Sequence, residues 1–436
     1  MTGPKPEPGA GAAGGPRVGL FGNLGSGNIG NDASMEAVLG YLRADHPGAA
    51  VDAFCGGAPD VRERYGIPAV PLFWYQKYEQ RVSGIPAIPL KVLGKGIDVF
   101  RTAAWVRRHD AVIVPGMGVL EASLPLRPWG FPYAMFLLCS SGKLFGTKVA
   151  LVSVGAGVIN QRLTRWLFNG AARRAFYRSY RDSQSRAAMR QRGIDTSRDP
   201  VYPDLAFALP APSQEAGDAG TVCVGLMDYH GSNDDRRRAD EIYRSYVAGM
   251  KVFIRWLLDN GRTVRLIVGD TNGSDDGVVR EIMDDLGQTR PGLAASRVTT
   301  QPVASFADVM RAIQPASSVV AIRFHNVLAA VKLGKPTIAV SYAPKHPALM
   351  ADMGLAGFCR PVFPLDAGKL IRQFVELERS SAELRQTVAA RSAANRQLLG
   401  EQFTRLWAAL FPAAEPARPV RSLEPVGEQS RANEPG

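Results

Sequence analysis

Two groups that could bind and protonate an anion stand close together in the sequence. Arg323 and His325 end the apolar run SVVAIRFH, which is typical of a buried strand. Alternate residues of a strand point to one face, so we expect both side chains to project together and Phe324 to turn into the core. A guanidinium, an imidazole and the start of a following helix suit an anionic substrate that must also receive a proton. The alternative is a hydrogen-bonded structural histidine beside an ion pair.

A loop rich in glycine and asparagine, GNLGSGNIGND, follows the first apolar run and precedes a helical pattern. Its glycines let the backbone approach a ligand, and the next helix points its N–H groups at an anion. The loop contains GxGxxG, but it is longer than the dinucleotide fingerprint, and the acidic residue expected next, Asp52, lies early in its strand. We therefore expect Asn28 and Gly30 to contact a sugar or phosphate. Asp32 is a further ligand or, like Asn31, the cap of the helix.

Polar residues also follow two strand-like runs in the second half of the chain. Tyr342 and Lys345 come after PTIAVSY, where Lys345 either reaches the same cleft or lies in solvent as surface lysines commonly do. Asp228 and His230 follow TVCVGLM and share one face if that strand continues. Because ligands of open α/β sheets bind outside the carboxyl ends of the strands, we expect these side chains to face one ligand.

Two candidate positions lie in the first half of the chain. Arg181 and Asp182 follow FYRSY; Arg181 is a candidate substrate ligand, and Asp182 is better explained as a helix cap with an ion pair. Asp204, in the run PVYPDLAFAL, faces a ligand or forms a turn. The sequence has no Ser–His–Asp motif, no HExxH and no CxxC among its four cysteines. We therefore expect no metal and four reduced, mostly buried thiols.

The elements that must position these residues alternate between strand-like runs and amphipathic helical patterns. Residues 17–210 give one such series, PAPSQEAGDAG reads as a linker, and residues 220–379 give a second series. Alternating strands and helices predict two doubly wound, Rossmann-like α/β domains that face a cleft. A helix over 380–412, opened by a capping box at Ser380 and Glu383, should pack across both domains. Residues 1–16 and 413–436 read as a disordered leader and tail.

Composition narrows the range of partners. The net charge is +12 and the pI about 9.7, which favours nucleic acid, an anionic membrane or anionic small substrates. The basic residues are scattered, with no basic stripe interleaved with exposed aromatics, so we do not expect nucleic acid as a partner. No secretion signal is visible, and no apolar stretch reaches the ~18 residues of a membrane span. We expect a cytoplasmic protein, at most peripheral to the membrane, with 74–100 as a membrane-facing lip or an irregular packed loop.

Together and in this order, the motifs resemble those of the polysaccharide pyruvyl transferase family. The resemblance covers about residues 17–360 and is carried by GNLGSGNIGNDAS, the glycine turn after AVIVPG, SYRDSQS, YPDLAF and RFHNVLAAVKLGKPTIAVSYAPK. It implies a glycosyltransferase-B-like fold and transfer of a pyruvyl group from phosphoenolpyruvate to a saccharide in cell-surface polysaccharide biosynthesis. It further implies that Arg323 and His325 are catalytic and that Gly116 and Gly118 of the glycine turn lie near substrate.

The implied donor suits the residues. Phosphoenolpyruvate carries a phosphate and a carboxylate, which Arg323, Lys345 and a helix N-terminus can bind. Its methylene carbon must be protonated, and a histidine such as His325 with an ordinary pKa of about 6.5 can supply that proton at neutral pH. The scheme needs no cofactor besides phosphoenolpyruvate as donor substrate.

The acceptor side is less defined by the sequence. Sugar hydroxyls attack the former enol carbon, and Asp32, Asp204 or Asp228 accepts their protons. We expect the first domain to hold the saccharide acceptor, free or lipid-linked, and the second to hold the donor. A glycosyltransferase that uses a nucleotide sugar on the same scaffold is the main alternative, and a saccharide-binding or assembly protein is a second one.

Overall fold

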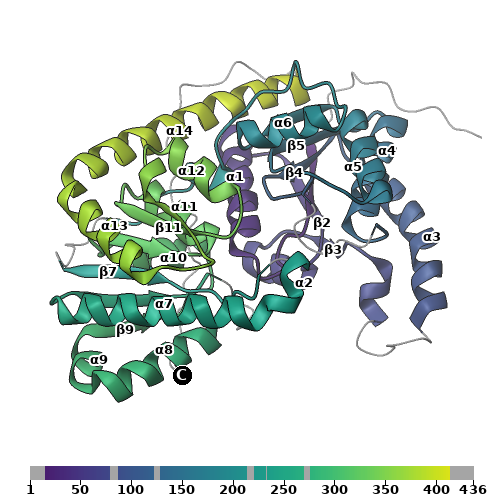
Figure 1. Ribbon diagram of the computed structural model, residues 1–436. Coiled ribbons are helices and arrows are strands. Elements are labelled where there is room, and N and C mark those ends of the chain that lie inside the picture. The colour runs from purple at the N-terminus through teal and green to yellow at the C-terminus, as the bar shows by residue number, and fades with distance from the viewer. Residues whose placement is uncertain are drawn as a thin grey trace, which may run out of the picture.

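The computed structural model describes residues 15–78, 87–121, 128–213, 220–231, 233–269 and 275–412. They form two α/β domains that lie side by side, each built on a parallel sheet covered by helices (Figure 1). The predicted pair of doubly wound, Rossmann-like domains is confirmed. Residues 1–14 of the predicted leader and all of the predicted tail, 413–436, lie outside the described residues.

The N-terminal domain contains a six-stranded sheet in the order β3-β2-β1-β4-β5-β6. Its strands are β1 (Arg17–Gly22), β2 (Ala50–Cys55), β3 (Ala69–Pro71), β4 (Ala111–Pro115), β5 (Lys148–Val154) and β6 (Tyr177–Tyr180). Its helices are α1 (Ile29–Asp45), α2 (Ala58–Tyr65), η1 (Trp74–Tyr78), α3 (Ala87–Val106), α4 (Phe131–Phe145), α5 (Arg162–Arg174), α6 (Ser183–Gln191) and η2 (Leu205–Ala208). Every residue of β4 is buried, as expected for a central strand with helices on both faces.

The C-terminal domain repeats this plan with a sheet in the order β12-β11-β10-β7-β8-β9. Its strands are β7 (Thr221–Gly225), β8 (Thr263–Ile267), β9 (Val298–Gln301), β10 (Ser318–Ala321), β11 (Thr337–Ser341) and β12 (Cys359–Pro361). Its helices are η3 (Asn233–Arg238), α7 (Ala239–Asp259), α8 (Asp276–Thr289), α9 (Pro291–Arg297), α10 (Phe306–Ile313), α11 (Phe324–Lys332), α12 (Lys345–Asp352), η4 (Ala356–Phe358) and α13 (Ala367–Arg379).

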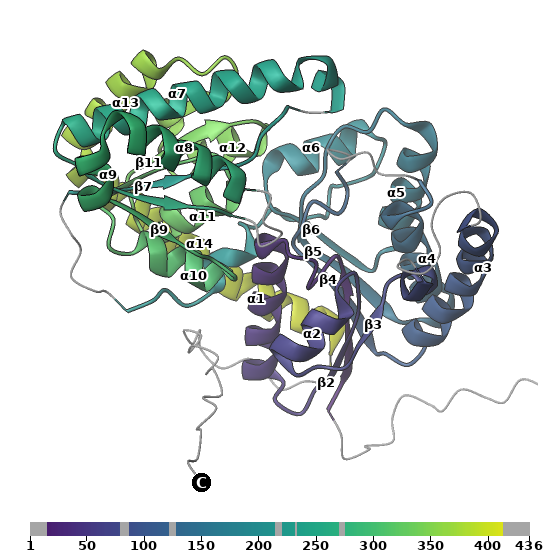
Figure 2. The ribbon, with the colours of Figure 1, turned by 90° about the horizontal axis from the view of Figure 1, so that it is seen from below.

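The strand order reverses once in each sheet, which creates two switch points. The chain leaves β1 toward β2 and later resumes at β4 on the other side of β1; it likewise leaves β7 toward β8 and resumes at β10. Such a reversal opens a crevice at the carboxyl ends of the two central strands, where ligands of open α/β sheets bind. Figure 2 shows α1, which follows the first switch-point strand, at the border with the C-terminal domain.

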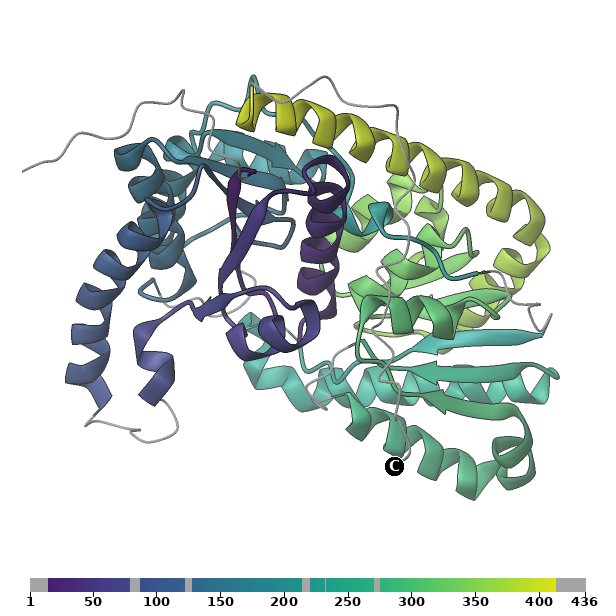
Figure 3. The same cartoon turned by 180° about the vertical axis from the view of Figure 1, so that it is seen from behind.

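A long final helix joins the domains. Helix α14 (Ser381–Leu410) runs across both of them (Figure 3). In the N-terminal domain, Phe403 stacks on Tyr41 of α1 with 4.0 Å between ring centroids. In the C-terminal domain, the Ser392 hydroxyl donates to the carbonyl of Lys332 at 2.8 Å. The two domains therefore share one C-terminal element, which fixes their mutual position.

Two local predictions about helices are wrong. Residues 74–100 do not form an irregular loop in the described part, because η1 and the twenty-residue α3 occupy most of it. Pro89 is compatible with that helix because it lies in the first turn, where no intrahelical N–H bond is lost. The capping box at Ser380 is also absent: Ser380 ends α13 and begins α14 at once, and its side chain makes no cap bond.

The run PVYPDLAFAL is not a strand. Val201 makes a single bridge to Tyr180, and the chain then turns into η2. Pro203 has no N–H to donate to a ladder, and the Asp204 carboxylate accepts from the N–H of Ala206 at 3.1 Å, which favours the turn. Within the described residues, no helix combines the length and apolarity needed to cross a membrane.

Candidate active site

The turn between β10 and α11 brings His325 against the first domain. Strand β10 ends at Ala321, Arg323 is the N-cap of α11, and His325 lies in the first helical turn. The expected strand alternation of Arg323 and His325 is therefore wrong, because the helix begins too early for it, although Phe324 is buried as expected. A Cβ placed on Gly30 would lie 1.9 Å from Nε2 of His325, so the ring rests on the glycine. The two switch points meet at this contact.

Arg323 is held by a buried carboxylate that the sequence analysis did not single out. Its Nε and one terminal nitrogen donate to Asp275 at 2.8 and 2.6 Å, and Asp275 is fully buried. Asp275 also accepts from the backbone N–H of Asp228 at 2.9 Å. A two-bond pair of this kind fixes the plane of the guanidinium. The alternative interpretation, a structural histidine beside an ion pair, predicted such a pair. The pair is present, and it orients Arg323 beside His325.

The pKa of His325 lies well below its usual range. Burial is the main cause, followed by the positive charges of Lys345, Arg323 and Arg181 and the neighbouring His346. Without a bound anion the imidazole is therefore neutral at neutral pH, and it does not have the ordinary pKa expected from the sequence. Burial likewise lowers the pKa of His346 to about 4, and its Nε2 lies 2.9 Å from the carbonyl of Ile322. His346 is thus a structural histidine.

Cations from both domains converge on the ring of Phe324. The guanidinium carbon of Arg181, after β6, lies 5.6 Å from the ring centroid, and Nζ of Lys345, at the start of α12, lies 4.8 Å from it. Lys345 is also 5.5 Å from the centroid of Tyr342. Arg181 forms an ion pair with Glu121, whereas Lys345 pairs with no carboxylate among the described residues. The predicted ligands Arg181, Tyr342 and Lys345 are thus brought together.

A cavity of about 310 Å³ lies between the domains next to these cations. Its polar and aromatic lining includes Arg181, Asp182, Asp204, Phe324, Lys345 and Asp352. Burial raises the pKa of Asp204, while Arg181, the N–H of Ala206 and Lys345 act in the opposite direction. Burial also raises the pKa of Asp352. His325 does not line the cavity, but Arg181 and Lys345 do, and both lower the pKa of His325.

The glycine and asparagine loop after β1 is held largely by its own polar groups. The side chain of Asn28 accepts from the N–H groups of Gly30 and Asn31 at 3.1 and 3.3 Å, so Asn28 is the cap of α1. The prediction that Asn31 or Asp32 caps this helix is wrong. The amide of Asn31 instead donates to the carbonyl of Asn23 at 3.0 Å and closes the loop.

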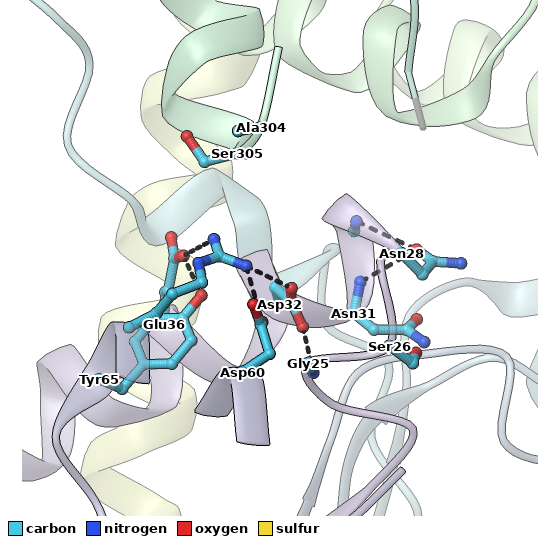
Figure 4. A network of polar contacts seen from close by, with 12 residues as sticks. Gly25, Ser26, Asn28, Asn31, Asp32, Glu36, Asp60, Tyr65, Ala304 and Ser305 are labelled. Carbon is cyan, nitrogen blue, oxygen red and sulfur yellow. Dashed lines mark hydrogen bonds and ion pairs between the residues drawn. The ribbon is translucent and has the colours of Figure 1, made fainter. Parts of the chain in front are cut away.

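Asp32 lies beneath the loop as a brace (Figure 4). One carboxylate oxygen accepts from the N–H of Gly25 at 2.7 Å and the other from Arg64 of α2 at 3.1 Å. Arg64 also meets Asp60 at 3.1 Å and Glu36 at 4.0 Å. Burial raises the pKa of Asp32, and the Gly25 N–H and Arg64 partly offset it. Both oxygens serve the fold, which leaves Asp32 poorly suited to bind substrate or to act as a base.

The glycine turn after β4 is packed too closely for side chains. Gly116 has φ +49°, and a Cβ there would lie 2.3 Å from Oγ of Ser34 on α1. A Cβ on Gly118 would lie 2.6 Å from Oε2 of Glu121, the partner of Arg181. These glycines therefore set the approach of the turn to α1 and to the Glu121–Arg181 pair.

Asp228 and His230 lie beyond the end of β7, which stops at Gly225, so the strand does not continue through them. They pair with each other at 2.9 Å, and the imidazole of His230 stacks on Tyr243 with 4.6 Å between centroids. Asp228 is therefore linked to the Arg323–His325 turn through its backbone, because its N–H donates to the carboxylate of Asp275, which pairs with Arg323.

Most of the described site lies within the range of residues that one protein-family model matches. A family model described as polysaccharide pyruvyl transferase matches residues 28–344, which include the end of the loop after β1 from Asn28 on, the glycine turn, Arg323, His325 and the run ending at Pro344. The chain belongs to the polysaccharide pyruvyl transferase family. No curated protein matches the chain.

Solved structures that resemble this pyruvyl transferase family member share its fold at low identity. One is assigned as a UDP-N-acetylglucosamine 2-epimerase from Listeria monocytogenes (12% identity, TM-score 0.59, 92% of this chain and 98% of that one). The UDP-GlcNAc 2-epimerase from Neisseria meningitidis has 11% identity, a TM-score of 0.53, and coverage of 88% and 99%. The lipopolysaccharide outer core galactosyltransferase WaaB has 14% identity, a TM-score of 0.51, and coverage of 91% and 99%. Glycosyltransferases and sugar-nucleotide epimerases thus share this two-domain architecture.

Sequence reasoning missed three residues at the site of this family member. Asp275 and Glu121 orient Arg323 and Arg181, and neither lies in a motif that would mark it. Asn326 is fully buried, its side-chain amide has no hydrogen-bond partner among the described residues, and it packs against Gly225 and against Gly269 after β8. Its position directly after RFH was the available signal. Among the described residues, no group of three or more His, Cys, Asp or Glu is arranged to hold a metal ion.

Proposed function

We propose that this protein transfers a pyruvyl group from phosphoenolpyruvate to a saccharide acceptor and releases phosphate. The family assignment supports the class of reaction. The observation that carries the proposal is the contact of His325 with Gly30, within a field of cations from Arg181, Arg323 and Lys345. A titratable group enclosed by positive charge suits a substrate that brings several negative charges and needs one proton.

The cations and the start of α11 bind the donor in this proposal. Phosphoenolpyruvate carries a phosphate and a carboxylate, and a fixed guanidinium such as Arg323 pairs well with either. Lys345 adds a point charge that no described carboxylate neutralises. The first N–H groups of α11 point out of the helix beside Arg323 and favour an anion further.

His325 delivers the proton after the donor has bound. Its pKa is low in the free protein because of burial and three neighbouring cations. The negative charges of phosphoenolpyruvate offset those cations and raise the pKa of the imidazole, so a proton is taken up with the donor. The imidazolium then protonates the methylene carbon, which becomes the methyl group of the pyruvyl product. The acid therefore forms only in the presence of the substrate that it serves.

The acceptor completes the transfer from the side of the cavity. A sugar hydroxyl attacks the cationic former enol carbon, and the C–O bond to phosphate breaks. A second hydroxyl closes the ketal, so one hydroxyl proton replaces the proton used at the methyl carbon and the other leaves with phosphate. Asp204 is our candidate base, because it lines the cavity and its raised pKa favours proton uptake. No cofactor is required besides the donor substrate.

The proposed acceptor and cellular setting are supported by the family assignment and not by the geometry. Members act on polysaccharides, so we propose a saccharide of a cell-surface polysaccharide as acceptor, joined to a lipid carrier at the cytoplasmic face of the membrane. The second domain holds the donor and the first holds most of the acceptor. This division agrees with the places of Arg323 and His325 on one side and of Asp204 and Arg181 on the other.

Acceptor-dependent release of phosphate from phosphoenolpyruvate tests the reaction. The purified chain is incubated with the donor and a panel of glycans, and His325→Ala should abolish release. His46→Ala is the matched control, because His46 ends α1 at the opposite end from Gly30 and should retain activity. Turnover with a nucleotide sugar, as expected from enzymes such as the galactosyltransferase WaaB, and none with phosphoenolpyruvate would overturn the proposal.

A further inference from the structure

Exposed apolar side chains are concentrated on one side of the N-terminal domain. Of the fourteen large apolar side chains that are exposed in the described residues, eleven belong to residues 88–176, which carry α3, α4 and α5. Figures 1 and 2 show these three helices together on the side of the N-terminal domain away from the C-terminal domain. Monomeric proteins seldom gather exposed apolar residues in this way without a partner. We call this surface the α3–α5 face.

Helix α3 is apolar toward solvent as well as toward the core. Its outward residues follow helical spacing, and Ile88, Val92 and Phe100 are 56%, 68% and 76% exposed. On the inward side of α3, Trp105 is buried and packs against Phe54 of β2. A surface helix normally places polar residues on its outer side, so the outer side of α3 is expected to be covered by an apolar medium.

The neighbouring helices continue this pattern with aromatic and aliphatic side chains. Trp129 before α4 and Trp166 of α5 are 56% and 59% exposed, and Leu144 at the end of α4 is 75% exposed. Trp166 stacks on Phe136 of α4 with 5.1 Å between centroids, and the guanidinium of Arg174 lies 5.1 Å from the same Phe136 ring. Tryptophans beside arginines are typical of surfaces at the boundary between headgroups and acyl chains.

The same stretch is strongly basic. Residues 87–121 and 128–176 contain eleven lysines and arginines and three carboxylates, a balance of +8 out of the +12 of the whole chain. All three carboxylates have partners: Asp98 is buried on Arg101, Glu121 pairs with Arg181, and Asp110 accepts the N–H of Arg17. The cations of α5 thus have no exposed carboxylate on their own helix.

We infer that the α3–α5 face binds an anionic lipid bilayer, with the apolar side of α3 in the interface and the basic residues on the headgroups. Charge complementarity decides the occupant. A second copy of the chain docked through the same face would place exposed cations such as Arg162, Arg165 and Arg173 against one another, whereas anionic headgroups attract them. The inference deepens the proposed function, because a protein held at this surface meets a lipid-linked acceptor; the binding itself does not depend on pyruvyl transfer.

Co-sedimentation of the full chain with vesicles tests the inference in the absence of any substrate. We expect binding to vesicles of phosphatidylcholine with phosphatidylglycerol, weak binding to phosphatidylcholine alone, and loss of binding as salt screens the charges. Arg162→Glu/Arg165→Glu/Arg173→Glu should lower partitioning by roughly a hundredfold, at about fivefold per basic residue near the surface. Val92→Ser/Phe100→Ser should weaken the binding that persists at high salt.

Matched controls separate a docking surface from general charge or hydrophobicity. Arg372→Glu/Arg379→Glu on α13 and Val252→Ser on α7 change exposed residues of the other domain and should leave binding unchanged. Phosphate release with a water-soluble glycan should be unaffected by the surface variants, so failure of the surface and failure of the reaction are distinguishable. Equal binding of all variants would overturn the inference. So would a dimer in sedimentation that the α3–α5 variants abolish without any vesicle binding.

Discussion

Each switch point contains a buried aspartate that accepts a loop N–H and pairs with an arginine. In the N-terminal domain, Asp32 accepts from Gly25 and pairs with Arg64. In the C-terminal domain, Asp275 accepts from Asp228 and pairs with Arg323 through two bonds. The two arrangements fix their loops in the same way, but the surroundings of the two arginines differ.

Arg64 contacts three carboxylates, whereas Arg323 pairs with Asp275 in a region where further cations lie close to His325. Arg64 meets Asp32 and Asp60 at 3.1 Å and Glu36 at 4.0 Å, so its charge is neutralised where it stands. Arg323 shares its neighbourhood with Lys345 and Arg181, and together they lower the pKa of His325. The first domain therefore contributes a braced backbone, a glycine and the cation Arg181, and the second contributes Arg323, Lys345 and the imidazole that we propose as the proton donor.

The largest effect is expected from replacing Asp275, the aspartate that pairs with Arg323 in the C-terminal domain. Asp275→Asn removes the fully buried carboxylate that holds the partly buried guanidinium of Arg323 through two bonds, which should lower the free energy of unfolding by about 3–5 kcal/mol. Because Arg323 also loses its fixed orientation, kcat/KM for phosphate release should fall by about 10² to 10³. Asp32→Asn keeps an acceptor for Gly25, and Arg64 keeps two carboxylates, so about 1–2 kcal/mol should be lost.

Denaturant unfolding and phosphate-release assays of Asp275→Asn and Asp32→Asn test these two expectations. The two aspartates differ in function if Asp32→Asn retains most of its activity once the fraction of folded protein is taken into account. Equal loss of kcat/KM in folded samples of both variants would show that the brace in the first domain is also part of the reaction site.

The contact between the domains gives the next effect. Gly30→Ala adds a Cβ at 1.9 Å from Nε2 of His325, so the imidazole or the domains must shift. A displacement of this size should reduce kcat by about 100-fold, while the helix gains up to ~1 kcal/mol from alanine. Gly277→Ala is the matched control, because Gly277 holds the same second position in α8 and its Cβ meets nothing within 4 Å. Full activity of Gly30→Ala would place His325 outside the reaction.

The sequence predicts the fold and most of the strand-end residues, and it fails where distant segments meet. Alternating strands and helices suffice for two parallel sheets, because crossover helices leave little choice of topology. Asp32 is visibly at a helix start, but whether it caps or braces depends on Arg64, which arrives from another helix 32 residues later. Asp275 meets Arg323 across 48 residues, and no local pattern marks it. The strand assumed for His325 ended two residues before Arg323, a boundary that periodicity does not resolve.

Titration of His325 gives a smaller but more specific effect. Its folded-state pKa lies well below 6.5, so below pH 6.5 the unfolded chain binds a proton that the folded chain does not. Stability is therefore lost as pH falls below 6.5, and His325→Asn should flatten this decline. Phosphoenolpyruvate should raise the pKa of His325, followed by NMR of labelled histidine, whereas Asp32→Asn should leave it unchanged. A pKa near 6.5 in the free protein would contradict the assignment of a buried, cation-surrounded imidazole.

The smallest effect is expected at Glu36, which belongs to the brace alone. Burial raises its pKa, the Tyr65 hydroxyl and Arg64 act in the opposite direction, and Asp32 and Asp308 add to the rise. A raised pKa means that the folded chain binds the extra proton, so the wild type loses stability as pH rises above 4.5. Glu36→Gln keeps an acceptor for Tyr65 at 2.7 Å and removes the repulsion. At pH 7 it should therefore match or exceed the wild type within about 1 kcal/mol, and this margin should vanish in acid. The Glu36→Gln variant should release phosphate at the rate of the wild type, because the Asp32–Arg64 pair acts on the loop after β1 and not on the donor. A variant that folds normally but loses turnover would contradict the distinction between the two aspartate–arginine pairs.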